Sequence, residues 1–465
     1  MERIAVPRIV ISGITPQAGK SLVTIGLLAE LRQRGISVSC CVIGSNFKQA
    51  LLLKGLSERN VHTLDPRIQT AGQMLESLYL ASLGAEVVLI EGEDTLIQSD
   101  GTGFGFSGGP DTYVSRVIHA PILPIIDGSM QSETSAAALR EVQHLIPDID
   151  LLPPIANRMP SSQAGVLERV KVINESLMKF GLPAILGAVP EVVNPEDLPS
   201  HGASQKRRAL PLSRQYLMDL SSILGKCIDI EEIVRLAKRS PTILLEDYLF
   251  KPDNRRCRIA FSLDNAFGLC YQDNLTHLKN AGADIVKFSP LADTHLPRDI
   301  GGLYLSGGFL EEYGQDLVRN EPMIRSIQKF HDEGGCIYSE GAGTAYLSRE
   351  FFVNGSRCHG VGIFRTTVKP GDGKYWHFTS SFLEDNVLGN RETAVSGLAN
   401  GDWMLSNPEG MLRCLRVKTP DGTTILDGYS PTGQVFGTFS FLHWGTNTDI
   451  PRFFVESSSV LKFQP

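Results

Sequence analysis

The sequence predicts an α/β protein built from two doubly wound domains, and three observations support this prediction. Short apolar runs alternate with segments of helical periodicity in the first part of the chain. A second series of the same kind begins at Arg258, after a polar, proline-containing stretch. The first apolar run, Ile9–Ser12, leads into a glycine-containing turn that ends in Lys20-Ser21. With 465 residues, the chain has room for two to three domains.

The turn after the first apolar run predicts a phosphate-binding loop. Gly19 allows the backbone to close tightly, Lys20 adds a positive charge, and the Ser21 hydroxyl can ligate Mg²⁺. A helix follows, with Leu22 and Ile25 at the start of its apolar face. A plain strand-to-helix turn without a nucleotide is the alternative. The loop predicts a nucleotide site with ATP and Mg²⁺ as cofactors, made by Gly13, Thr15, Gln17, Ala18, Gly19, Lys20 and Ser21.

Two further residues follow predicted strands of the same domain. Glu91 terminates the strand expected over 86–90, at the sheet edge where ligands of such folds bind. We interpret Glu91 and Lys20 as catalytic residues. Glu91 and Ser21 are the expected ligands of Mg²⁺. The alternative is that Glu91 is an ordinary glutamate at the end of a strand. Asn157 ends the strand expected over 151–157, at a position where nucleotide-binding folds often read the base.

Composition excludes several classes of protein. The net charge of −7 argues against a nucleic-acid partner held by phosphate neutralisation. No run of 18 apolar residues predicts a membrane-spanning helix, and no targeting peptide precedes the phosphate loop, so we expect a cytoplasmic protein. The eight cysteines are scattered without a Cys-x-x-Cys pair, which favours neither a zinc site nor a disulfide framework.

The expected domain boundaries follow from these patterns. A phosphate-loop domain is expected over 1–195, a helical linker over 196–256 and a second α/β domain over 257–465. The segment 101–109 holds five glycines and is expected to be irregular. It is either a substrate-facing loop or a surface connection.

The second domain carries the motifs that relate the chain to a known family. Arg258–Gly268, Tyr271–Leu275, Phe288–Asp293 and Leu305–Glu311 resemble cobyrinic acid a,c-diamide synthases. That resemblance implies a dethiobiotin synthetase-like ATPase domain followed by a class I glutamine amidotransferase-like, flavodoxin-like domain. It also implies that ATP and Mg²⁺ activate a tetrapyrrole carboxylate, which is then amidated with ammonia from glutamine, and that the protein is a homodimer or a complex with an active paralogue.

The glutaminase motif departs from the family pattern, which is close to Ala-Glu-Cys-Gly-Gly. Here the turn after the strand at Cys336 reads Ser-Glu-Gly-Ala-Gly, so Gly341 stands where the nucleophilic cysteine belongs. A thioester needs a thiolate, and glycine has no side chain to supply one. His443 matches one of two family histidines, Phe441 replaces the other, and we expect His443 to persist as a hydrogen-bonded structural residue.

Three functions are compatible with these features. The first is an ATP-dependent amide ligase that uses free ammonia or ammonia from another subunit. The second is a catalytically degenerate, nucleotide-binding paralogue that serves as a partner or regulator in tetrapyrrole or cofactor biosynthesis. The third is an ATPase switch, which leaves the second domain unexplained. The family segments near Asn46 and Glu91 have also changed, so the substrate stays open.

Overall fold

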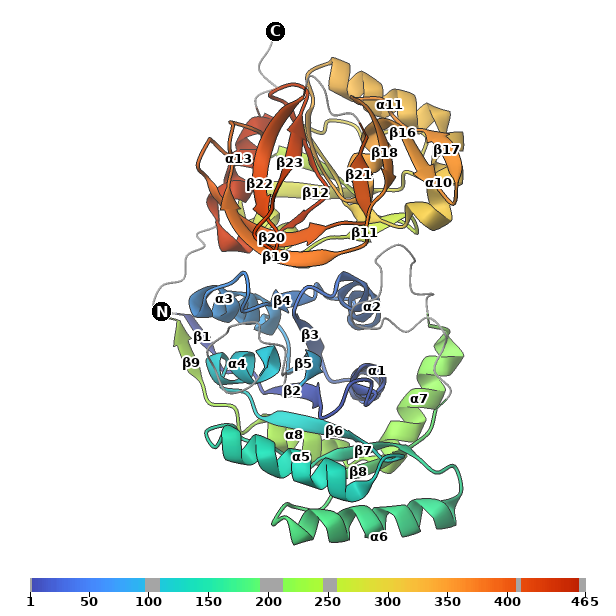
Figure 1. Ribbon diagram of the computed structural model, residues 1–465, viewed down its shortest axis with the longest axis vertical. Coiled ribbons are helices and arrows are strands. Elements are labelled where there is room, and N and C mark those ends of the chain that lie inside the picture. Colours follow the sequence, from blue (N-terminus) through green and yellow to red (C-terminus); the bar gives the residue numbers. More distant parts are fainter. Residues whose placement is uncertain (1, 97–108, 193–211, 246–256, 407–410, 460–465) are drawn as a thin grey trace. The chain divides into compact units, whose positions relative to one another are not determined.

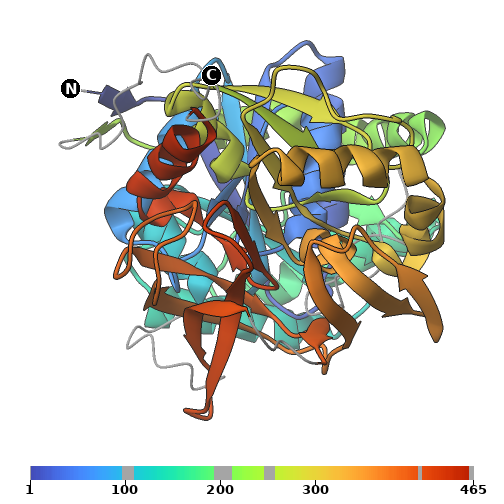
Figure 2. The ribbon, with the colours of Figure 1, turned by 90° about the horizontal axis from the view of Figure 1, so that it is seen from above.

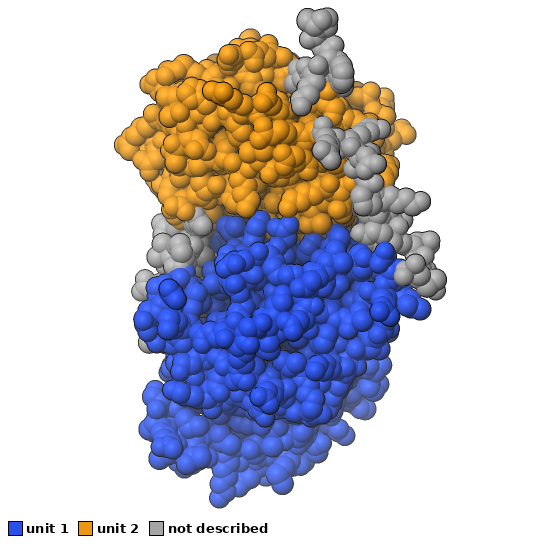
Figure 3. Space-filling view, turned by 180° about the vertical axis from the view of Figure 1, so that it is seen from behind, with its two compact units in different colours: residues 1–201, 209–248 blue, residues 202–208, 249–465 orange. Residues whose placement is uncertain are grey.

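The computed structural model describes residues 2–96, 109–192, 212–245, 257–406 and 411–459. The chain divides into unit 1 (residues 1–201 and 209–248) and unit 2 (residues 202–208 and 249–465), coloured separately in Figure 3. None of the helices in these described ranges is both long and apolar enough to cross a bilayer.

Unit 1 is a doubly wound parallel sheet, as predicted (Figure 1). The strand order is β4-β3-β5-β2-β6-β7-β8. The strands of this sheet are β2 (Arg8–Gly13), β3 (Val38–Ile43), β4 (His62–Leu64), β5 (Val87–Thr95), β6 (Ile122–Asp127), β7 (Ile155–Met159) and β8 (Gly187–Pro190). The helices of unit 1 are α1 (Lys20–Gln33), α2 (Phe47–Ser57), α3 (Ala71–Ser82), α4 (Pro110–Val117), α5 (Ser132–Leu145), α6 (Gln163–Lys179), α7 (Arg214–Cys227) and α8 (Ile230–Ala237).

Alternation along the central strands places the core of unit 1 on both faces of the sheet. Ile9 and Ile11 of β2 pack with α1, α2, α7 and α8, whereas Val10 between them packs with α3, α4 and α5. Strands that are buried on both faces carry apolar side chains at successive positions, which explains uninterrupted apolar runs such as Ile9–Ile11.

The segment expected as a linker contributes to unit 1. Leu220 and Leu224 of α7 and Ile233 of α8 belong to the same core cluster as α1. Strand β9 (Ile243–Leu245) pairs antiparallel with β1 (Glu2–Ile4). The glycine-rich segment expected to be irregular lies outside the described residues, except for Gly109, which precedes α4.

Unit 2 contains a second sheet with the strand order β12-β10-β13-β15-β24-β23-β22, parallel from β12 to β24 and antiparallel beyond. Its strands are β10 (Cys257–Ser262), β12 (Ala283–Phe288), β13 (Gly302–Leu305), β15 (Cys336–Glu340), β22 (Leu412–Lys418), β23 (Thr424–Ser430) and β24 (Val435–Thr438). The helices are α9 (Gln272–Asn280), α10 (Leu310–Arg319), α11 (Glu321–Asp332), α12 (Ala342–Leu347) and α13 (Asp449–Ser459), with the 3₁₀ turn η1 (Trp444–Thr446).

Helices again cover both faces of this sheet. Tyr304 and Tyr338 pack with α9 and α13, whereas their neighbours Leu303 and Ile337 pack with α10, α11 and α12. Figure 2 shows α11 in gold and α13 in red on different sides of the unit 2 sheet. Smaller sheets surround the main one: β11 (Phe267–Leu269) with β14 (Gly307–Gly308); β16 (Ser348–Val353), β17 (Ser356–His359), β18 (Phe364–Pro370) and β21 (Trp403–Leu405); and β19 (Tyr375–Ser381), β20 (Ala394–Asn400) and β25 (Phe441–Leu442).

Candidate functional site

The predicted phosphate loop connects β2 to α1 and is held by a residue far away in sequence. Gly19 precedes α1 with a φ of +92°, a left-handed conformation that favours glycine. A Cβ added to Gly19 would lie 1.9 Å from Asn157 Nδ2, so a side chain would collide there. Asn157 Nδ2 in turn donates a hydrogen bond to the Ala18 carbonyl at 3.0 Å. Asn157 therefore buttresses the loop backbone, and its role in reading a base stays a prediction.

The other loop residues lie along one short connection. Gly13 ends β2, Gln17 is exposed with a φ of +60°, and Lys20 opens α1 with its side chain largely buried. The hydroxyl of Thr15 is buried and has no hydrogen-bond partner among the described residues. A buried amine, an unsatisfied hydroxyl and the start of a 14-residue helix together fit an anionic phosphate group.

Glu91 lies within hydrogen-bond reach of this loop. Ser21 Oγ donates to Glu91 Oε1 at 2.5 Å, and Gln49 Nε2 donates to Oε2 at 2.6 Å. Burial raises the pKa of Glu91, while these two hydrogen bonds and the charge of Lys20 act in the opposite direction. An oxygen pair made of a carboxylate and a hydroxyl is a donor set that Mg²⁺ favours.

The structure corrects the placement of Glu91 in its strand. The expected strand ended at residue 90, but β5 continues to Thr95, so Glu91 lies inside the strand. Gln49 is a site residue that no sequence motif marked. One feature of the sequence could have identified Gln49: it lies in the first turn of the helix that follows β3. Strand β3 is the neighbour of β5, which carries Glu91.

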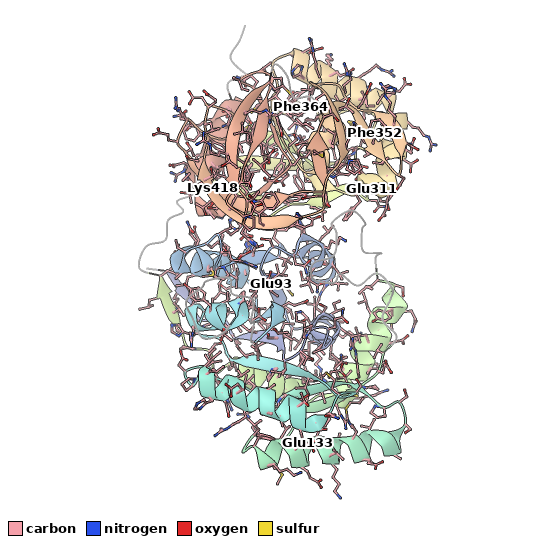
Figure 4. All side chains as sticks on the ribbon, viewed as in Figure 1. Glu93, Glu133, Glu311, Phe352, Phe364 and Lys418 are labelled. Atoms are coloured by element: carbon pink, nitrogen blue, oxygen red, sulfur yellow. The ribbon has the colours of Figure 1, made fainter. Side chains whose placement is uncertain are left out.

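Unit 1 also contains a second polar cluster, formed by Arg67, Asp65 and Glu93, that no sequence motif marked. The guanidinium of Arg67 bridges two carboxylates, at 2.8 Å from Asp65 and 2.6 Å from Glu93, which is labelled in Figure 4. Asp65 also accepts a hydrogen bond from Ser45 Oγ at 3.0 Å. Because Asp65 follows β4 and Glu93 lies late in β5, the parallel sheet brings the two carboxylates together.

In unit 2, Gly341 stands at the turn expected to present a nucleophile. It separates β15 from α12 with a φ of +53° and a ψ of −121°, a conformation that side chains rarely adopt. The turn therefore keeps a constrained backbone although it carries no side chain.

The ring of Phe441 fills the space beside this turn. A Cβ added at Gly341 would lie 3.1 Å from Phe441 Cζ and 3.4 Å from Gly307 Cα. A Cβ added at Gly307 would lie only 2.4 Å from Phe441 Cε1. The buried ring thus lies against both glycines, where a nucleophilic side chain and its substrate would need room.

The expectation of a hydrogen-bonded His443 is wrong. Neither ring nitrogen has a hydrogen-bond partner in the described part of the chain, and Nε2 lies 3.7 Å from Asp273 Oδ2. The fully buried imidazole instead packs edge-on against Tyr271, with 4.7 Å between ring centroids. This ring contact and the backbone hydrogen bond from the His443 N–H to the Ser396 carbonyl, at 2.9 Å, position the residue.

Glu340, directly before the turn, is a functional candidate that the sequence analysis did not single out. Tyr304 and Tyr338 donate their hydroxyls to its two oxygens at 2.6 and 2.8 Å. Complete burial raises its pKa to about 8, although the two tyrosine hydrogen bonds oppose this shift. Trp444 stacks on Tyr304 at 5.4 Å, which completes an aromatic wall around the carboxyl group.

Comparisons with known proteins bear on both units. Residues 258–448 match the family of CobB/CobQ-like glutamine amidotransferase domains. The cobyrinate a,c-diamide synthase of Syntrophotalea carbinolica is 31% identical over 344 residues, 74% of this chain and 73% of that protein. The corresponding synthase of Dehalococcoides mccartyi (strain ATCC BAA-2266) is 28% identical over 477 residues, 97% of this chain and 98% of that protein.

Among solved structures, PurLQS from Thermotoga maritima is similar at 17% identity and a TM-score of 0.34, covering 45% of this chain and 98% of that one. The sequence relatives cover both the phosphate-loop unit and the amidotransferase-like unit. The motifs of both units and these relatives together show that the chain belongs to the cobyrinate a,c-diamide synthase family.

Proposed function

We propose that the chain is an ATP-dependent amide ligase that acts on a tetrapyrrole-type carboxylate with ammonia that its own glutaminase turn does not produce. The observation that carries this proposal is the arrangement of Lys20, Ser21 and Glu91 around the phosphate loop. Kinship with cobyrinate a,c-diamide synthases supports the substrate class.

Each residue of the loop has a role in this proposal. Lys20 and the first N–H groups of α1 bind phosphate oxygens, and Ser21 and Glu91 hold Mg²⁺. Gln49 orients the Glu91 carboxylate, and Asn157 keeps the loop closed. When bound, ATP would supply the phosphoryl group that activates the carboxylate for attack by ammonia.

The source of ammonia follows from unit 2. Gly341 offers no thiol, and Phe441 fills the adjacent space, so ammonia would come from solution or from another subunit. The same observations favour a second candidate, a catalytically degenerate nucleotide-binding partner or regulator. The two candidates share the nucleotide site and differ in turnover.

Nucleotide binding is tested with Lys20→Ala. A ligand at a hundredfold excess over its Kd stabilises a protein by about 2.7 kcal/mol, so ATP·Mg²⁺ should raise the melting temperature of the wild type. Lys20→Ala should remove this rise, and Lys171→Ala, which changes an exposed lysine of α6, should keep it. An equal rise in wild type and Lys20→Ala would reject the nucleotide site.

Turnover then separates the two candidates. ADP release from ATP in the presence of cobyrinate should depend on ammonium chloride and should not be supported by glutamine. If the wild type binds ATP but releases no ADP with ammonium, the degenerate partner is the better description.

A further inference from the structure

Unit 2 contains a cavity whose lining residues have no role in the proposed function. Its volume is about 420 Å³, within the range of small-molecule sites. Residues of strands β19 to β23, which are labelled in Figure 1, contribute to its lining. Four aromatic residues line it: Trp376, Trp403, Tyr429 and Phe439. Flat aromatic walls favour ligands with a planar ring.

Two polar groups in this cavity are suited to an anionic substituent. Arg413 lies with its guanidinium carbon 5.1 Å from the Tyr429 ring centroid and donates one hydrogen bond, to the Leu426 carbonyl at 3.1 Å. The indole N–H of Trp376 is buried and has no hydrogen-bond partner within the described ranges. A guanidinium with unused donors and an unsatisfied indole N–H can both bind a carboxylate.

Two carboxylates line the cavity, and both have partners. Asp372 accepts a hydrogen bond from the Lys374 backbone N–H at 3.1 Å, and its other oxygen lies 3.6 Å from Lys374 Nζ. Asp427 accepts hydrogen bonds from the hydroxyls of Thr438 and Ser440, each at 2.7 Å, and from the backbone N–H of Phe439 at 3.1 Å. Since these donors stabilise its charge, Asp427 does not require a cationic ligand, and Arg413 supplies the charge available for recognition.

The rim of the cavity is unusually apolar. Met404, Ile425 and Leu426 all line it, and they are 54%, 42% and 40% exposed. In the described part of unit 2, they make up three of the four exposed large hydrophobic side chains; Leu412 is the fourth. Apolar side chains gathered at the mouth of an aromatic cavity are typical of a ligand-binding surface.

We infer that this cavity binds a planar ring compound that carries a carboxylate: the ring lies between the aromatic walls and the apolar rim, and the carboxylate contacts Arg413 and the Trp376 N–H. The inference rests on the lining residues of unit 2 alone, so it holds whether or not unit 1 uses ATP.

Tryptophan fluorescence provides the test, because two of the three tryptophans line the cavity and Trp444 lies in the core. 2-Naphthoate and its neutral analogue 2-naphthamide serve as matched probes. Naphthoate should quench the fluorescence saturably and bind the wild type about tenfold more tightly than naphthamide. Arg413→Gln should remove that preference, and Arg416→Gln, on the same strand but outside the cavity lining, should retain it.

A second variant keeps the test valid if Arg413→Gln perturbs the fold. Met404→Glu changes an exposed rim residue and should weaken naphthoate binding several-fold, whereas Met404→Gln should not. The inference is overturned if naphthoate does not quench saturably, if naphthamide binds equally well, or if Arg413→Gln and Arg416→Gln behave alike.

A competition experiment between naphthoate and a larger ring compound measures how large a ring the cavity accepts. Mesoporphyrin IX should displace naphthoate if the compound is a tetrapyrrole, with its dimethyl ester as the uncharged control. If mesoporphyrin does not compete while naphthoate depends on Arg413, the site accepts a smaller aromatic carboxylate.

Discussion

Glu91 combines a buried carboxyl group with two neutral hydrogen-bond donors, Ser21 and Gln49, and this combination defines its expected behaviour. Glu91→Gln keeps the shape of the side chain but cannot ionise. It therefore removes the cost of burying a charge, which is the effect that raises the pKa of this carboxyl group. We expect unfolding free energy to change by no more than about 2 kcal/mol. Affinity for nucleotide in the presence of Mg²⁺ should fall at least about tenfold because a metal ligand is lost.

Titration calorimetry with ATP at several Mg²⁺ concentrations measures this effect. Glu86→Gln, which changes an exposed glutamate just before β5, is the matched control. An unchanged Mg²⁺ dependence in Glu91→Gln would show that this carboxylate does not act through the metal.

Asn157 allows a positioning role to be separated from base recognition. Asn157→Ala removes the 3.0 Å hydrogen bond to the Ala18 carbonyl and leaves a gap beside Gly19. A residue that only supports the loop should weaken ATP, GTP and inorganic triphosphate binding by a similar factor, about fivefold for a loss of 1 kcal/mol. A loss confined to ATP would instead assign Asn157 to the base.

Glu340 predicts a pH dependence of stability. Its pKa is about 8 in the folded protein and about 4.5 when exposed, so between these values the folded state holds a proton that the unfolded state has lost. The contribution of this group to stability is therefore fully present below about pH 4.5 and declines as the pH rises to about 8. Glu340→Gln cannot titrate.

Urea unfolding midpoints from pH 5 to pH 9 measure this dependence. The unfolding free energy of the wild type, relative to that of Glu340→Gln, should fall as the pH rises. Only the wild type has a carboxyl group at position 340 that loses its proton. A difference that stays constant over this range would mean that Glu340 is ionised throughout.

At the scale of single elements, the turn between β15 and α12 leaves little space beside Gly341. Gly341→Cys would place a Cβ 3.1 Å from Phe441 Cζ on a backbone with positive φ, so we expect a loss of about 1–3 kcal/mol in unfolding free energy. The new thiol should release no glutamate from glutamine, because Phe441 fills the space needed by the substrate.

Thiol titration checks this prediction directly. Of the eight native cysteines, only Cys227 is not buried, so the folded wild type should expose few thiols to an aromatic disulfide reagent. Gly341→Cys should add none, and Gly341→Cys with Phe441→Ala should add one. Glutamine hydrolysis by the single variant would contradict the closed site.

The boundary between two consecutive helices of unit 2 depends on a local signal. Helix α10 ends at Arg319 and α11 begins at Glu321. Asn320 caps α11 by accepting a hydrogen bond from the Met323 N–H at 3.4 Å, and a proline lies in the first turn. A cap followed by proline is a start signal that periodicity alone does not reveal.

At the scale of the whole molecule, each unit has its own hydrophobic core. All three tryptophans lie in unit 2, at positions 376, 403 and 444. Tryptophan fluorescence therefore reports the unfolding of unit 2 alone, whereas circular dichroism reports both units. We expect ATP·Mg²⁺ to raise a melting transition seen by circular dichroism without moving the one seen by fluorescence.

2-Naphthoate should have the opposite effect and raise the melting transition of unit 2. Lys20→Ala should abolish only the response to ATP, and Arg413→Gln only the response to naphthoate. If either ligand shifts both transitions equally, the two units unfold as one cooperative structure.

Patterns among neighbouring residues were sufficient to predict the local features of this protein. Apolar runs, helical periodicity and the order Gly-Lys-Ser predicted the phosphate loop between β2 and α1, and the missing thiol at Gly341 excluded a thioester. The folded chain was needed to show which distant residues meet. Asn157 contacts the loop, Gln49 contacts Glu91, Phe441 lies beside Gly341, and five strands surround the unit 2 cavity. Periodicity and turn chemistry act within about ten residues. These contacts instead depend on strand order and packing, which bring together side chains that no local pattern connects.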